Sequence, residues 1–236
     1  KLIANTRNIG HRLAYFSIET NDAEMMRLYL LSKGVQAPTN KLKETNGILG
    51  FFIKDPNGTI CQFIQKTKHF PVFKNDTENY NNSPIATKIN HVGFMVSDLE
   101  KANKFYVDIL GFKETWRGSK DGKNVTWVNL TVTDGSDYLE LMLYDKEQSP
   151  ENMGVLNHVS LEVENIFEIE KRLSTRVLPQ NFKTTTPIKV GINKKRQINT
   201  FDSDSTRIEI MEAITIDGIP AASSNAEPLR FKGIQN

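Results

Sequence analysis

The chain has 236 residues, with 30 lysines and arginines against 28 aspartates and glutamates and a net charge of +2; this length allows one or two domains with a sizeable core. The interspersed charges argue against a nucleic-acid surface or a membrane-binding helix, and a single cysteine, Cys61, excludes a disulfide framework and a cysteine-rich zinc site. No apolar run is long enough to span a membrane, and because the sequence starts at Lys1 rather than methionine, the compartment (cytoplasmic or exported) stays open.

The predicted elements begin with a strand in HRLAYFSIET and a helix in NDAEMMRLYLLSKG, which Asn21 or Asp22 would cap and Gly34 would end. Two strands follow in NGILGFFIKDPNGTICQFIQ, on either side of a turn at residues 55–58. Residues 67–87 are polar and contain asparagine and proline, which is typical of an interdomain linker. His69 lies in that linker, and we expect no role for it.

The next unit opens with the strand INHVGFMV, which carries His91, and closes with the strand DYLELMLY, which carries Glu140. Between them, a helix capped by Ser97 or Asp98 and ended by Gly111 has apolar side chains along one face, as a helix packed on a core does. FKETWRG and VTWVNLTV supply the middle strands.

The last unit repeats this order. The strand LNHVSLEV carries His158, a helix follows at Ile166 to Arg176, and the closing strand TRIEIMEA carries Glu209. The middle strands are predicted at residues 182–190 and 195–202. Residues 214–236 are predicted to form an irregular tail.

The histidine and the carboxylate recur at matched places in the two units. His91 and Glu140 are 49 positions apart, and His158 and Glu209 are 51 apart. Each of them alternates with apolar residues, so it lies on the strand face opposite a wholly apolar row. Two imidazoles and two carboxylates on one face are a suitable set for one divalent metal ion of the first transition row, such as Zn, Ni, Co, Fe or Mn.

These two spaced pairs resemble the vicinal-oxygen-chelate superfamily, which includes glyoxalase I, extradiol dioxygenases and bleomycin-resistance proteins. The resemblance implies an α+β fold, in which tandem βαβββ modules form a cup-shaped mixed β-sheet. It also implies metal ligands at His91, Glu140, His158 and Glu209, with the first and last strands of each module side by side. It covers about residues 88–213.

Residues 1–66 are expected to form a degenerate module of the same kind. Aligning FSIET with LEVEN places Leu13 at the histidine position and Gln62 at the glutamate position, so we expect no metal there and an ordinary role for His11. Modules of this family pair, and the simplest expectation is a partner module upstream of Lys1. The expected domains are therefore 1–66, a linker at 67–87, a complete two-module domain at 88–213 and a tail at 214–236.

The expected activity is that of a glyoxalase-like lyase or isomerase. A metal held by two imidazoles and two carboxylates keeps positions for two neighbouring substrate oxygens, and it can stabilise an enediolate. The resemblance to glyoxalase I implies that a carboxylate takes a proton from carbon; Glu209 or Glu140 would be that base, and the sequence does not decide between them. Residues on the same predicted face are candidates for binding a small-molecule substrate: Trp127, Asn129, Tyr138 and Met142.

Two other functions stay open. An extradiol-type dioxygenase would use His91, His158 and Glu209 as ligands, but the chain has four histidines and none is spare in the metal-binding domain. A non-catalytic small-molecule binder is the third class, although such relatives generally lack the full ligand set. We expect no nucleic-acid or membrane partner, and the oligomeric state, including a homodimer, stays open.

Overall fold

The computed structural model describes residues 13–71, 84–86, 88–176, 185–202 and 205–232. The chain packs as two compact units. Of the described residues, the smaller unit contains 14–71 and 101–110, and the larger unit contains 13, 84–86, 88–100, 111–176, 185–202 and 205–232. Within the described residues, no helix is both long and apolar enough to cross a membrane.

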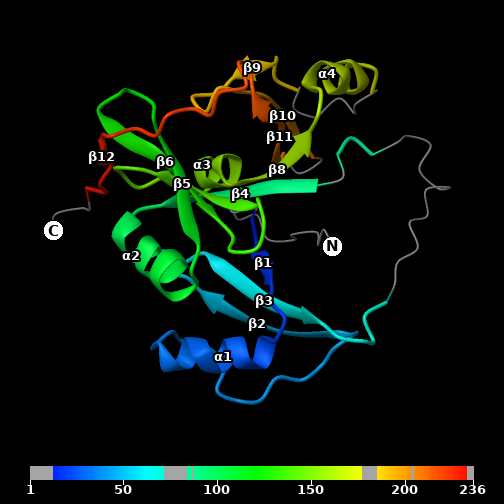
Figure 1. The fold of residues 1–236 in the computed structure, drawn as a ribbon, viewed down its shortest axis with the longest axis vertical. Coiled ribbons are helices and arrows are strands. Elements are labelled where there is room, and N and C mark those ends of the chain that lie inside the picture. Colours follow the sequence, from blue (N-terminus) through cyan, green and yellow to red (C-terminus); the bar gives the residue numbers. More distant parts are fainter. Residues whose placement is uncertain (1–12, 72–83, 87, 177–184, 203–204, 233–236) are drawn as a thin grey trace. The chain divides into compact units, whose positions relative to one another are not determined.

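The smaller unit is built on a three-stranded sheet with the order β1-β3-β2 (Figure 1). Its elements are β1 (Phe16–Glu19), α1 (Ala23–Ser32), β2 (Ile48–Lys54) and β3 (Ile60–Lys66). β1 runs parallel to β3, and β2 and β3 form an antiparallel pair. Helix α1 starts at Asp22, whose side chain accepts a hydrogen bond from the Met25 backbone N–H, as an N-cap does. His11 and most of the predicted strand before Tyr15 lie outside the described residues.

The predicted helix at 97–111 is an α-helix, α2 (Leu99–Asn103), that continues as a π-helix, η2 (Lys104–Ile109). Most of it belongs to the smaller unit, where the fully buried Tyr106 donates a hydrogen bond of 2.9 Å to the Asp55 carboxylate. Cys61 Sγ lies 3.4 Å from the same hydroxyl. Burial raises the pKa of this thiol to about 12, so Cys61 is a structural residue rather than a reactive one.

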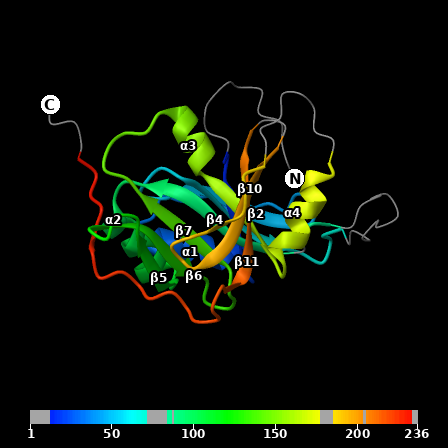
Figure 2. The same cartoon turned by 90° about the horizontal axis from the view of Figure 1, so that it is seen from above.

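The larger unit contains a nine-stranded mixed sheet. Its elements in chain order are β4 (Lys88–Val96), β5 (Lys113–Ser119), β6 (Asn124–Thr131), β7 (Tyr138–Leu143), α3 (Pro150–Leu156), β8 (His158–Val163), α4 (Ile166–Ser174), β9 (Lys189–Val190), β10 (Lys195–Phe201), β11 (Arg207–Thr215) and β12 (Glu227–Pro228). The sheet order is β12-β6-β7-β4-β8-β11-β10-β9, and β5 pairs with β6 (Figures 1 and 2).

The two halves of this sheet have the same connectivity and meet at one antiparallel pair, β4 and β8. On either side, the first strand of each half pairs in parallel with its last strand, β4 with β7 and β8 with β11. The next strands outward, β6 and β10, are antiparallel to β7 and β11. The predicted α+β fold, with βαβββ modules that form a mixed curved sheet, is therefore confirmed.

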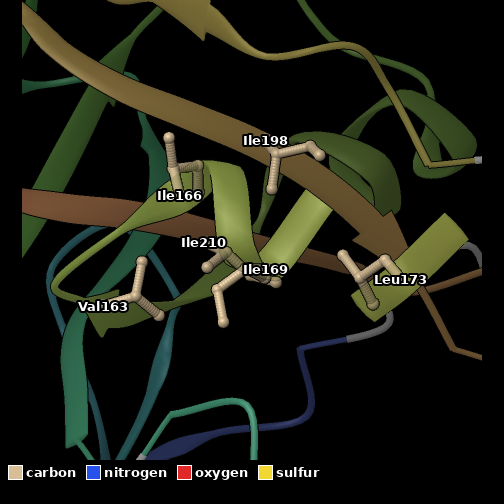
Figure 3. Close-up of a cluster of buried hydrophobic side chains, with 6 residues drawn as sticks. All are labelled: Val163, Ile166, Ile169, Leu173, Ile198 and Ile210. Carbon is tan, nitrogen blue, oxygen red and sulfur yellow. The ribbon is translucent and has the colours of Figure 1, made fainter. Parts of the chain in front are cut away.

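The apolar face of the second half is buried under helix α4. Figure 3 shows its side chains, which come from that helix and from β8, β10 and β11: Val163, Ile166, Ile169, Leu173, Ile198 and Ile210. Ile198 and Ile210 are almost fully buried, and each is next in sequence to a polar residue of the opposite face, Asn199 and Glu209. Because successive side chains of a strand point to opposite faces, this core fixes which face receives the polar residues.

Some predicted details differ from the structure. Helix α3 was not predicted, and the predicted strand at 182–190 is described only as β9, since residues 177–184 lie outside the described part. The tail after residue 213 is not wholly irregular, because β11 continues to Thr215 and β12 pairs in parallel with β6. This short pairing satisfies backbone groups of β6 that would otherwise be at a free edge.

Candidate metal centre

The four side chains predicted as ligands come from four adjacent strands of the larger sheet. In the order of the sheet they are Glu140 on β7, His91 on β4, His158 on β8 and Glu209 on β11. A β-bulge between Ile89 and His91 interrupts the pairing of β4 with β8. Beyond the bulge, His91 pairs with Ser160 and Gly93 pairs with His158, so both imidazoles lie on the same face of the sheet.

The donor atoms of these side chains converge. The Nε2 atoms of His91 and His158 are 3.1 Å apart. Glu209 Oε2 lies 3.4 Å from Nε2 of His91 and 3.7 Å from Nε2 of His158. Glu140 Oε2 lies 4.0 and 3.7 Å from the same two nitrogens. Donor atoms that share one metal ion, at bond lengths of roughly 2.0–2.2 Å, lie about 3–4 Å apart.

The cluster suits a metal ion by its chemistry as well as by its spacing. His91, Glu140 and His158 each offer one donor atom within 4.8 Å of the others, so this group could hold a metal ion. Glu209 is not part of that mutual set, but its carboxylate is close to both imidazoles. Both histidines and Glu209 are buried, and buried carboxylates that face one another need a positive charge between them.

The pKa shifts of the two imidazoles and two carboxylates also favour a cation at this place. Burial and the neighbouring His158 lower the pKa of His91 to about 3, and burial lowers the pKa of His158, so both imidazoles are neutral donors at pH 7. Burial and the charge of Glu209 raise the pKa of Glu140 to about 8. Burial opposes ionisation of Glu209 as well, but the two imidazoles and Arg207 lower its pKa.

Each imidazole contacts a side chain of the neighbouring strand, which helps to orient the ring. The Tyr138 ring stacks on the His91 ring, with centroids 4.6 Å apart. Nδ1 of His158 lies 2.8 Å from the carbonyl oxygen of Leu156 and in close contact with Nη2 of Arg207. Arg207 Nη2 also donates to that carbonyl. When Nδ1 of His158 donates its proton to Leu156, Nε2 is left with a free lone pair for a metal.

A glycine makes room for the second imidazole. A β-carbon placed on Gly93 would lie 2.1 Å from Cε1 of His158 and 2.6 Å from its Nδ1. No side chain fits at that distance, so the His158 ring occupies the space above β4 only because residue 93 has no side chain.

Three polar residues next to the carboxylates were not predicted as part of the metal site. Gln197 Nε2 donates a hydrogen bond of 2.9 Å to Glu209 Oε1. Asn199 is paired directly with Glu209, and Asn129 directly with Glu140. The side-chain oxygens of both asparagines are buried without a hydrogen-bond partner among the described residues. Their places opposite the glutamates follow from strand register, which the sequence pattern alone does not give.

The candidate substrate-binding residues lie on the face of Glu140. Asn129 pairs with Glu140, Trp127 with Met142, and Thr131 with Tyr138 across β6 and β7. Met142 and Asn129 are buried, whereas Trp127 and Tyr138 are partly exposed. Tyr138 contacts His91 directly, so its first role is to orient that ring.

The pairing in the smaller unit corrects one prediction. In each half of the larger sheet, the residue that pairs with the glutamate lies two positions after the histidine. Gly93, which follows His91, pairs with Glu140, and Ser160, which follows His158, pairs with Glu209. Gln62 pairs with Ser17, so the corresponding position is Tyr15 and not Leu13. Ser17 donates a hydrogen bond of 2.8 Å to Gln62, and the Tyr15 ring contacts Phe52 edge-on.

The part of the chain that contains this cluster matches a known protein family. The family model described as Glyoxalase/Bleomycin resistance protein/Dioxygenase superfamily matches residues 88–210, which include all four side chains. Methylmalonyl-CoA epimerase, a mitochondrial protein of Mus musculus, is 36% identical over 88 residues, 34% of this chain and 47% of the epimerase. The match thus spans about half the length of that relative.

Solved structures resemble the chain in fold. The Mn(II)-bound glyoxalase from Novosphingobium aromaticivorans has a TM-score of 0.57 and 13% identity, over 92% of this chain and 65% of its own. The 2,3-dioxygenase LapB from Pseudomonas sp. KL28 has a TM-score of 0.62 and 14% identity, over 89% of this chain and 76% of its own. At these identities the likeness concerns the fold alone.

Proposed function

Because this chain belongs to the Glyoxalase/Bleomycin resistance protein/Dioxygenase superfamily, we propose that it is a metal-dependent isomerase or lyase. Its substrate would be a small oxo- or hydroxy-carbonyl compound that binds through two neighbouring oxygens. The observation that carries the proposal is the convergence of two neutral imidazoles and two carboxylates on the cup face, with His91 Nε2 and His158 Nε2 only 3.1 Å apart.

His91, Glu140, His158 and Glu209 would hold one divalent metal ion. When bound, such an ion supplies Lewis-acid chemistry that stabilises negative charge on a substrate carbonyl oxygen. The imidazoles of His91 and His158 would hold the ion, and their orientation is maintained by Tyr138 and by the Leu156 carbonyl. A carboxylate oxygen of Glu140 or Glu209 takes the proton from the carbon next to the carbonyl and later returns it.

The similarity to an epimerase supports proton transfer at carbon, since an epimerase inverts one carbon centre. A ring-cleaving dioxygenase is less well supported, because two carboxylates face the imidazoles where that reaction would use one. Within the described part of the larger unit, the histidines are His91 and His158, and both belong to the candidate metal centre, so neither is spare for that reaction. A non-catalytic binder would not need the complete donor set.

The proposal is tested by metal analysis followed by proton exchange. Elemental analysis should find one divalent ion per chain in the wild type and in His69→Ala, and none in His91→Ala or His158→Ala. The metal-loaded protein is then incubated in D2O with 2-oxo aldehydes, 2-hydroxy ketones and branched acyl thioesters, and NMR follows deuterium incorporation next to the carbonyl. A wild type that binds no divalent metal, or that exchanges none of these protons, would refute the proposed function.

A further inference from the structure

Arg207 places a positive charge beside the metal centre that the proposed chemistry does not use. It lies on β11 two residues before Glu209, and because alternate residues of a strand share a face, both side chains lie on the face that carries the imidazoles. There its Nη2 atom donates to the Leu156 carbonyl and contacts Nδ1 of His158. The guanidinium is therefore on the side of the sheet where a substrate would bind.

Within the described part of the chain, the guanidinium of Arg207 forms no ion pair. The Leu156 carbonyl accepts from one of its five N–H donors, and its Nε is buried without a hydrogen-bond partner. Burial lowers the pKa of Arg207, as it does for a cation withdrawn from water, although the residue is still partly exposed. A partly buried cation without a paired anion is unfavourable, so this side chain is suited to receiving one.

The neighbouring charges do not cancel that of Arg207 once a metal ion is bound. Glu140 and Glu209 carry two negative charges, and a divalent ion offsets both. Lys195 is a second cation close to the centre, but it interacts with Glu162, which offsets its charge. The loaded centre therefore keeps one net positive charge, at Arg207, and a bound monoanion would neutralise it.

The charge of Arg207 also acts on the candidate ligands themselves. After burial, which is the largest influence on the pKa of each, Arg207 favours the deprotonated form of all four: His91, Glu140, His158 and Glu209. The same charge repels a divalent cation, so for metal binding alone an arginine is unfavourable at this place. An anionic ligand that binds next to the metal position accounts for both its location and its charge.

We propose that Arg207 binds a carboxylate of the substrate, so that the preferred substrate is an oxo or hydroxy acid. The inference rests on the proposed function and narrows its substrate class. A guanidinium can donate two parallel N–H bonds to one carboxylate, which orients the ligand as well as neutralising its charge. Neutral carbonyl compounds of the proposed class would still bind, but more weakly.

The proposal is tested with two probes of the same shape: pyruvate and its neutral amide, pyruvamide, measured by calorimetry on the Mn²⁺-loaded protein. Because Mn²⁺ itself attracts the anion, the quantity compared between variants is the preference for pyruvate over pyruvamide. Arg207→Gln should reduce this preference by about 10–100-fold, as the loss of a hydrogen bond to a charged group does. Arg207→Lys retains the charge and should keep more of the preference.

The matched control is Arg196→Gln. Arg196 precedes Gln197 on β10 and therefore lies on the opposite face of the sheet, where it pairs with Glu212 at 2.9 Å. This variant should keep the wild-type preference. An unchanged preference in Arg207→Gln, or an equal loss in Arg207→Gln and Arg207→Lys, would overturn the assignment.

Metal affinity separates this role from a structural one. If Arg207 did no more than orient the His158 ring, Arg207→Gln would weaken Mn²⁺ binding and leave the preference for pyruvate unchanged. We expect instead that the variant binds Mn²⁺ at least as tightly as the wild type. The reason is that it loses a positive charge near the ion, while the Leu156 carbonyl still orients His158.

The outcomes distinguish this inference from the proposed function. If the wild type binds Mn²⁺ and prefers pyruvate through Arg207 but exchanges no proton next to a carbonyl in D2O, the proposed function fails and the carboxylate site is still supported. If exchange occurs and Arg207→Gln changes neither the exchange nor the preference, the inference alone fails. A wild type that takes up no Mn²⁺ would overturn both.

Discussion

The imidazole of His158 lies against the backbone of Gly93 so closely that a β-carbon on residue 93 would be 2.1 Å from Cε1 of the ring. The two residues are directly paired across β4 and β8. The position of the His158 imidazole, a candidate metal ligand, is therefore fixed by the absence of a side chain on the neighbouring strand.

The first prediction concerns this contact. Gly93→Ala should push the His158 ring away, reduce metal affinity by about 10–100-fold and cost about 1–3 kcal/mol of unfolding free energy through overpacking. Chelator competition and urea unfolding measure the two effects. Gly135→Ala is the matched control, because its β-carbon would meet Val132 at an ordinary 3.4 Å. A Gly93→Ala variant with wild-type metal affinity would contradict the proposed position of His158.

The second prediction concerns pH and applies to the metal-free protein. Burial lowers the pKa of His91 to about 3, from an unfolded value of 6.5. Between these values the unfolded chain binds the extra proton, so stability is retained above pH 6.5 and lost as the pH falls toward 3. When the unfolded chain binds one proton more than the folded protein, the free energy of unfolding falls by about 1.4 kcal/mol for each pH unit of acidification. His91→Gln should show a smaller loss between pH 7 and 5 by urea unfolding.

The control for that experiment is His69→Gln, because the His69 side chain is 62% exposed and lies in the smaller unit. Its loss of stability between pH 7 and 5 should stay close to that of the wild type, because the exposed contact of His69 with Glu44 contributes little to stability. If His91→Gln keeps the full loss of stability in acid, the buried, neutral state assigned to His91 is wrong.

The third prediction concerns the smaller unit. Tyr106→Phe removes the 2.9 Å hydrogen bond to Asp55 and leaves a carboxylate oxygen without its partner. An unsatisfied buried group costs about 1–3 kcal/mol, and burial already raises the pKa of Asp55. Equilibrium unfolding should show this loss, whereas Tyr144→Phe should change stability by less than about 0.5 kcal/mol. Equal stability of the two variants would argue against the Tyr106–Asp55 bond.

From the sequence, His91, Glu140, His158 and Glu209 could be expected on one face, because strand alternation and the two matched offsets constrain their positions strongly, and the structure brings these four side chains together. It could not find Gln197 or Arg207, since their contacts with Glu209 and His158 depend on how one strand is registered against another. The same limit explains the error at Leu13. A slip of two residues, from Tyr15 to Leu13, keeps every side chain on its face, so alternation cannot detect it.

The antiparallel pair of β4 and β8 has a consequence for folding. It joins the two imidazoles although they are 67 positions apart in the chain, and the carboxylates come from strands on either side. A slip of one residue would send His91 or His158 to the apolar side and disrupt the candidate cation site. A cation bound by these four side chains would therefore act as a reversible cross-link that forms only across correctly matched strands, and it would stabilise the native topology relative to misfolded ones.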